Sequence, residues 1–123
     1  SATLDDINAG LMQVAADLGV ELRTAQSNVE GTMIDILHGW RGVVQGVVVN
    51  AGAYTHTSLA LRDAFMATMI PFVEIHLSNV YAREPERHHS MLAGVAIGSV
   101  TGLGAEGYEF ALRGLVSALR RRS

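Results

Sequence analysis

The chain has 123 residues, of which 49% are hydrophobic and 17% are charged, so we expect a single folded domain over residues 1–123 and no disorder. Nine basic and twelve acidic residues give a formal charge of −3, which argues against nucleic-acid binding, and the apolar stretches are far shorter than the roughly 20 residues that span a bilayer. Cysteine is absent, which excludes disulfide scaffolds and cysteine-ligated zinc, and no basic, apolar leader is visible, so we expect a cytoplasmic protein.

The first part of the chain predicts two helices with a strand between them. Thr3 can cap a helix that ends at Gly19. Residues 20–25 alternate apolar and polar side chains, which predicts a strand. A second helix is expected to begin at Asn28 and to turn four side chains inward, namely Met33, Ile34, Leu37 and Trp40.

The rest of the chain continues to alternate between strand and helix. Residues 43–49 form a β-branched run broken only by Gln45 and Gly46, which is typical of a buried parallel strand. The remaining predicted elements are a helix capped by Thr57 or Ser58 that ends near Met69, strands over 71–77 and 92–100, and a helix over 106–120. This alternation predicts a mostly parallel sheet with helices on both faces, and ligands of such sheets bind beyond the carboxyl ends of the strands.

Polar side chains follow the strand predicted over 43–49. Asn50 and His56 lie in a short segment that leads into a helix. One interpretation is an ordinary polar loop with a helix cap, and the other is that both side chains contact a polar ligand.

Glu74 and His76 lie two residues apart on the next predicted strand, so they share one face. A carboxylate beside an imidazole can orient the ring and support a general acid near neutral pH. The alternative is that His76 is a core residue with a satisfied hydrogen bond, but burying two ionisable groups on one face is costly without a purpose.

Three other motifs indicate further functions less strongly. The segment 83–90 is typical of a solvated charged loop, and its adjacent His88 and His89 lack the spacing and third ligand of a metal site. Residues 102–107 match G-x-G-x-x-G, but too little chain follows for a dinucleotide fold, so a tight turn is the better interpretation. A serine hydrolase could use one further set, Ser58, His56 and Asp63, although no nucleophile elbow is present.

Five segments occur together in a familiar order and spacing. They are Gln26 to Gly31, Asn50 to Ser58, Glu74 to Asn79, Arg83 to Ser90, and Gly102 to Tyr108. The set resembles type II 3-dehydroquinate dehydratase over essentially the whole chain. The resemblance implies a flavodoxin-like, doubly wound, three-layer α/β/α fold with strand order 2-1-3-4-5, and a homododecamer built as a tetramer of trimers. It also implies an anti elimination of water from 3-dehydroquinate through an enolate, giving 3-dehydroshikimate without metal or cofactor.

The resemblance also implies roles for the residues on the strand ends. His76 would be the general acid that protonates the departing C1 hydroxyl, and Glu74 would support it. Asn50 and His56 would bind substrate hydroxyls, and Asn50 would also hold the water that stabilises the enolate.

Four further positions would complete substrate binding. The backbone N–H groups of Leu77 and Ser78, with the Ser78 hydroxyl, would hold the substrate carboxylate. Arg87 would bind ring hydroxyls from the other side, and Asp63 would reach the site of a neighbouring subunit in the trimer.

Members of the family begin with a strand and a mobile lid that carries the proton-abstracting tyrosine, and this sequence begins after both. Tyr54, Tyr81 and Tyr108 do not align with that base, so we expect it from an N-terminal lid outside this sequence. The segment is either present in the protein ahead of these residues, supplied as a separate fragment after cleavage, or deleted. The first two are favoured because losing a central strand costs more than a domain's usual stability of about 5–15 kcal/mol. The alternative function is a non-catalytic, truncated scaffold or assembly subunit.

Overall fold

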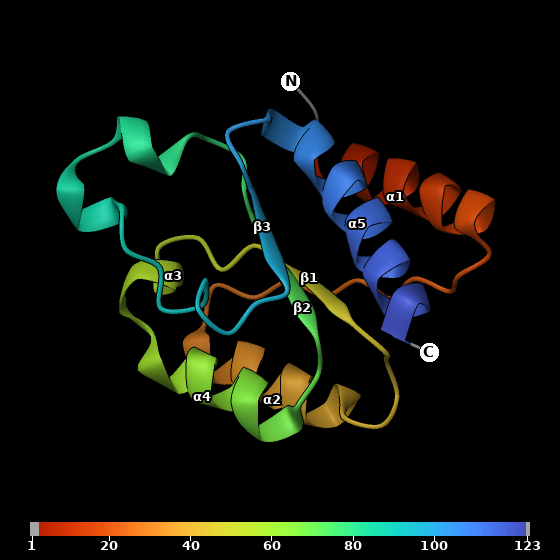
Figure 1. The fold of residues 1–123 in the computed structure, drawn as a ribbon, viewed down its shortest axis with the longest axis horizontal. Helices are drawn as coiled ribbons and strands as arrows, with labels where there is room; N and C mark the ends of the chain where they lie inside the picture. Colours follow the sequence, from red (N-terminus) through yellow and green to blue (C-terminus); the bar gives the residue numbers. More distant parts are fainter. Residues whose placement is uncertain (1–2, 123) are drawn as a thin grey trace.

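The computed structural model, which describes residues 3–122, contains a parallel sheet of three strands in the order β1-β2-β3 (Figure 1). The strands are β1 (Val47–Val49), β2 (Phe72–His76) and β3 (Gly98–Thr101). Val48 pairs with Val73, and His76 pairs with Thr101, so β2 is bonded on both sides. The parallel sheet predicted from the alternation of elements is therefore confirmed.

Helices cover both faces of this sheet, as predicted (Figure 1). One face carries α2 (Glu30–Trp40) and α4 (Leu59–Thr68), and the other carries α1 (Leu4–Leu18) and α5 (Gly107–Arg122). A short helix, α3 (Tyr54–Thr57), precedes α4, and three 3₁₀ turns complete the structure at Val80–Ala82, Pro85–Arg87 and Gly104–Glu106. Among residues 3–122, no helix is long and apolar enough to cross a bilayer.

The period of two along β2 divides its side chains between the two helical layers. Phe72 faces α4, where its ring stacks on Phe65 with centroids 3.9 Å apart. Val73 faces the opposite layer and packs on Ala111 and Leu115 of α5. Since β2 is buried on both faces, a polar side chain on it must find its partners inside the protein.

The helix ends follow the predicted capping chemistry. Thr3 and Asp6 form a reciprocal capping box at the start of α1, and Gly19 ends that helix with φ of 71°, in the left-handed region that glycine adopts at little cost. Ser58 caps α4, because its hydroxyl accepts a hydrogen bond from the N–H of Leu61 at 2.9 Å.

The strand predicted over residues 20–25 is absent from this part of the structure. These residues form no regular element and pair with no described strand, because an open groove of about 620 Å³ lies between them and β1. Apolar residues of several elements line this groove, among them Leu11, Val48, Leu112 and Val116. Alternation made residues 20–25 suited to a strand, but a strand forms only where a neighbour supplies its hydrogen bonds.

Three other predicted boundaries were wrong. The helix expected from Asn28 begins at Glu30. The strand expected over 43–49 contains only 47–49, because the N–H groups of Val43 and Val44 bond to the Trp40 carbonyl in the turn after α2. The strand expected over 92–100 begins at Gly98, because residues 92–96 form turns that hydrogen-bond locally.

Candidate active site

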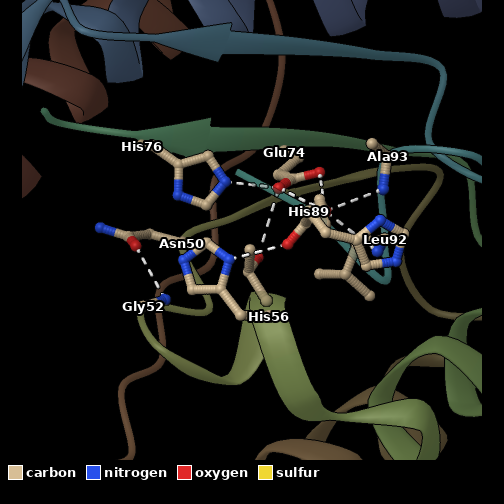
Figure 2. Close-up of polar contacts among 10 residues, drawn as sticks. Asn50, Gly52, His56, Glu74, His76, His89, Leu92 and Ala93 are labelled. Carbon is tan, nitrogen blue, oxygen red and sulfur yellow. Dashed lines mark hydrogen bonds and ion pairs between the residues drawn. The ribbon is translucent and has the colours of Figure 1, made fainter. Parts of the chain in front are cut away.

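Glu74 and His76 lie on the same face of β2, near its carboxyl end (Figure 2). Both side chains are buried, and Glu74 is only 1% exposed. His76 Nε2 donates a hydrogen bond to Glu74 Oε1. Because Nε2 is held in this way, Nδ1 is the ring atom that His76 has left for a ligand.

The Glu74 carboxylate is held by three side-chain donors. Besides His76, it accepts hydrogen bonds from the hydroxyl of Ser90 at 2.8 and 2.9 Å and from that of Thr55 at 3.3 Å. Burial raises the pKa of Glu74, but the hydrogen bonds and the charge of protonated His76 outweigh burial and hold this pKa below its usual value. Glu74 is therefore ionised at neutral pH and presents a negative charge to the His76 ring.

A polar pocket of about 310 Å³ opens beside this pair. Its volume is at the lower end of the range for small-molecule sites. The residues that line it come from the carboxyl ends of β1 and β2 and from the loops that follow: Asn50, Gly52, Ala53, His56, His76, Leu77, Ser78, Val80, Arg83 and Arg87. The structure thus brings together every predicted site residue except Asp63 and Glu74, and Glu74 lies directly behind His76.

Asn50 and His56 are both held in place by hydrogen bonds to other loops. Asn50 Oδ1 accepts from the Gly52 N–H at 3.1 Å, and its Nδ2 donates to the Tyr108 hydroxyl at 3.0 Å. His56 Nδ1 donates to the His89 carbonyl at 2.8 Å, and its ring lies nearly parallel to that of His76, with centroids 6.3 Å apart (Figure 2). These bonds leave one Asn50 N–H and the Nε2 of His56 for a ligand.

Two arginines, Arg83 and Arg87, also line the pocket and bring positive charge to it. Arg83 approaches the Ser78 hydroxyl at 3.5 Å, and Arg87 is paired with Glu84. A pocket with two guanidinium groups and several uncharged hydrogen-bonding groups fits a small anion that carries hydroxyl groups.

Asp63 lies outside this pocket. Its side chain is 64% exposed on α4 and is 3.8 Å from Arg62. Asp63 therefore does not line the pocket that residues 3–122 of the same subunit form.

The glycines of the 102–107 motif form a tight turn, as predicted. Gly102 and Gly104 have φ of 85° and 65°, and a Cβ on Gly102 would lie 3.2 Å from the Asn79 side chain. Within residues 3–122, no group of three histidine or acidic side chains is arranged to hold a metal ion.

The hydrolase alternative was wrong. Ser58 is 2% exposed, and its hydroxyl accepts the Leu61 N–H as a helix cap. His56 faces the His89 carbonyl and Asp63 pairs with Arg62, so no triad is assembled from these side chains.

Sequence reasoning missed three residues that support the site. Ser90 and Thr55 bind the Glu74 carboxylate, and Tyr108 on α5 contacts Asn50. Ser90 and Tyr108 end two of the five recognised segments, but no rule of spacing connects either of them to its partner across the fold.

Comparisons with known proteins agree on one family. The family model described as class II dehydroquinase matches residues 1–116. A 3-dehydroquinate dehydratase of Gemmatimonas aurantiaca is 75% identical over 97% of this chain and 78% of the relative, and one of Tolumonas auensis is 55% identical over the whole chain and 81% of the relative. The type II dehydroquinase structure from Propionibacterium acnes superposes with a TM-score of 0.88 at 35% identity, covering 95% of this chain and 86% of that one.

Proposed function

Because this chain belongs to the class II dehydroquinase family, it is a lyase that dehydrates 3-dehydroquinate, and we propose how its own residues carry out that reaction. The observation that carries the proposal is the buried Glu74–His76 pair at the edge of a small polar pocket. Elimination of water requires an acid for the leaving hydroxyl, and a histidine backed by an ionised carboxylate suits that role at neutral pH.

His76 is the proposed general acid, acting through Nδ1. A base removes a proton from C2, and the electrons left behind form an enolate with the neighbouring ketone. The enolate then collapses as the C1–O bond breaks, and the oxygen leaves as water with the proton from His76. The C1–C2 double bond of the conjugated product forms in this step. Glu74 stays ionised and offsets the positive charge of His76 before the transfer.

Asn50 and His56 are the proposed ligands of the substrate hydroxyls. The free N–H of Asn50 can also hold a water molecule against the enolate oxygen, where negative charge develops. Both side chains are fixed by bonds to the backbone or to α5, so little reorganisation is needed when substrate binds.

The far end of the pocket is proposed to bind the carboxylate and the ring. The N–H groups of Leu77 and Ser78, with the Ser78 hydroxyl, take the substrate carboxylate, and Arg87 binds ring hydroxyls. The positive charge of Arg83 beside Ser78 supports an anion at this end.

The C2 base is proposed to come from a segment outside residues 1–123 whose strand occupies the groove beside β1. The groove lies between β1 and residues 20–25, where one further strand would join the two. The tyrosines of this chain are engaged otherwise: Tyr54 donates to the Asn28 carbonyl, Tyr108 binds Asn50, and Tyr81 is tilted against His88 on the surface. Intact-mass measurement of the natural protein tests this, since a single species of only residues 1–123 would contradict it.

The proposed assembly is a homododecamer made of four trimers, in which Asp63 reaches a neighbouring subunit's site. Asp63 is exposed on α4 beside the exposed apolar side chains of Leu59 and Met66, which suits an interface. Light scattering on the full-length protein tests the assembly, and a monomer would contradict it.

Location in the cytoplasm also stays a prediction, to be tested by fractionating cells that express the tagged protein.

The lyase itself is tested by adding 3-dehydroquinate to the full-length protein and recording the absorbance of the conjugated enone. His76→Ala should lower kcat by roughly 10²- to 10⁴-fold, the usual contribution of a general acid. His38→Ala is the matched control, because that histidine is exposed near the end of α2. Absence of enone with His76 intact would refute the activity, and a discrete oligomer without turnover would support the scaffold alternative.

A further inference from the structure

One loop residue contacts the site from behind. Ser90 follows His89, whose carbonyl holds His56 (Figure 2). The Ser90 hydroxyl donates to the two oxygens of Glu74, at 2.8 and 2.9 Å. The same loop therefore touches both the imidazole that contacts the pocket and the carboxylate behind the proposed acid.

The surroundings of the Ser90 hydroxyl fix the direction of its hydrogen bond. A serine hydroxyl has one proton to donate and two lone pairs to accept with. The N–H groups of Leu92 and Ala93 both donate to this oxygen at 3.0 Å, which uses both lone pairs. The proton is left for Glu74, so the hydroxyl acts toward the carboxylate as a donor and cannot accept a proton from it.

We propose that Ser90 is a positioning residue of the dehydratase, holding Glu74 as an unprotonated acceptor aimed at His76. A donor fixed in this way favours the ionised carboxylate over the protonated one, because a protonated oxygen would meet a hydroxyl that has no free lone pair. The low pKa of Glu74 agrees with this direction. Thr55 adds a weaker, fully buried donor to the same oxygen at 3.3 Å.

Replacing Ser90 removes none of the charged groups near the Glu74–His76 pair, so we attribute a change in the titration of Glu74 to loss of the hydroxyl. The titratable groups of the pocket beside Glu74 are His76 on its own strand, His56 on α3, and Arg83 and Arg87 on the loop after β2. The strand positions paired with Glu74 are the uncharged Val49 and Ser99, and α4 packs apolar side chains against this layer.

The experiment compares Ser90→Ala with the parent in the full-length protein. Carbon-13 NMR of the glutamate carboxyls gives the titration midpoint of Glu74, and steady-state kinetics give kcat and KM against pH. We expect the midpoint to rise by roughly one pH unit, since the lost bond was made to a charged group. The acid limb of kcat should move up by the same amount while KM changes little. Ser90→Thr, which keeps the hydroxyl, should restore both.

Two further variants separate positioning from structural support. Ser58→Ala removes another buried hydroxyl, one that accepts a backbone N–H rather than donating to Glu74. It should therefore lower Tm and leave the titration midpoint of Glu74 in place. Thr55→Val keeps the loop caps and should raise the midpoint by less than Ser90→Ala does, which decides the question if Ser90→Ala fails to fold.

The inference is overturned if the Glu74 midpoint stays where it was in folded Ser90→Ala, or if Ser58→Ala moves it equally. Unfolded Ser90→Ala together with an unmoved midpoint in Thr55→Val would overturn it as well. The inference rests on the proposed function only for its kinetic part. A parent that binds no substrate and shows no turnover would refute the proposed function, while the NMR titration would still decide the role of Ser90.

Discussion

Replacing Glu74 with glutamine tests the catalytic pair most directly. The substitution keeps the shape of a side chain that is 1% exposed, but it removes the negative charge that His76 Nε2 faces. A glutamine also places an NH2 group, which only donates, where the carboxylate has its second oxygen, so it cannot accept from Ser90 at both oxygens as the carboxylate does. A hydrogen bond to a charged partner contributes about 1.5–3 kcal/mol, and the same loss in the transition state lowers kcat by roughly 10- to 150-fold.

The assay is the enone absorbance of the full-length protein, measured as kcat and KM from pH 5 to pH 9. Glu86→Gln is the matched control, because Glu86 is an exposed carboxylate on a nearby loop. Since Glu74 acts through His76, the loss should nearly vanish when it is measured in a His76→Ala background. The reasoning is refuted if kcat of Glu74→Gln stays within twofold of the parent, or if the losses from the two substitutions multiply.

The remaining predictions concern stability. Gly102→Ala should lower the free energy of unfolding by about 1–2 kcal/mol in urea titrations, because a φ of 85° strains any residue with a Cβ. Gly114→Ala, on the exposed face of α5, should instead raise it by up to about 1 kcal/mol, and equal effects of the two substitutions would contradict this. Because the pKa of Glu74 in the folded protein lies below 4.5, its ionised form adds to the free energy of unfolding above pH 4.5, and this stabilisation is lost as pH falls through the folded pKa. Glu74→Gln cannot ionise, so the free energy of unfolding of this variant should fall less between neutral and acid pH than that of the parent. The Val47 N–H bonds to the Pro71 carbonyl, so the Val48 N–H points into the groove; in the full-length protein both amides should resist hydrogen exchange, and a fast Val48 amide would argue against a strand there.

The chemistry of the site was predictable where it depended on a local period. The spacing of two from Glu74 to His76 places both side chains on one face of a strand, wherever that strand lies in the sheet. In the same way, a polar segment after a buried strand placed Asn50 and His56 at the edge of the sheet, and positive φ values at Gly102 and Gly104 followed from the turn.

What could not be predicted depends on partners distant in sequence. Residues 20–25 have the pattern of a strand, but a strand is stabilised by its neighbour, and the pattern does not contain that neighbour. Ser90 reaches Glu74 across 16 residues and Tyr108 reaches Asn50 across 58, so each contact exists only after the chain has folded. A single serine or tyrosine in a loop has too many possible roles for its position to select one.

The location of the acid explains how one strand can carry both stability and chemistry. An ionised carboxylate inside an apolar layer is destabilising unless its oxygens are bonded, and here three donors from three segments satisfy it. The carboxylate in turn holds the imidazole of His76 on β2, a strand bonded on both sides, so the proposed acid is in position before substrate binds. The proposed base, on a segment outside residues 1–123, could then move over the pocket without disturbing the proposed acid. The proposed mechanism therefore places the acid on a rigid strand and the base on a separate segment.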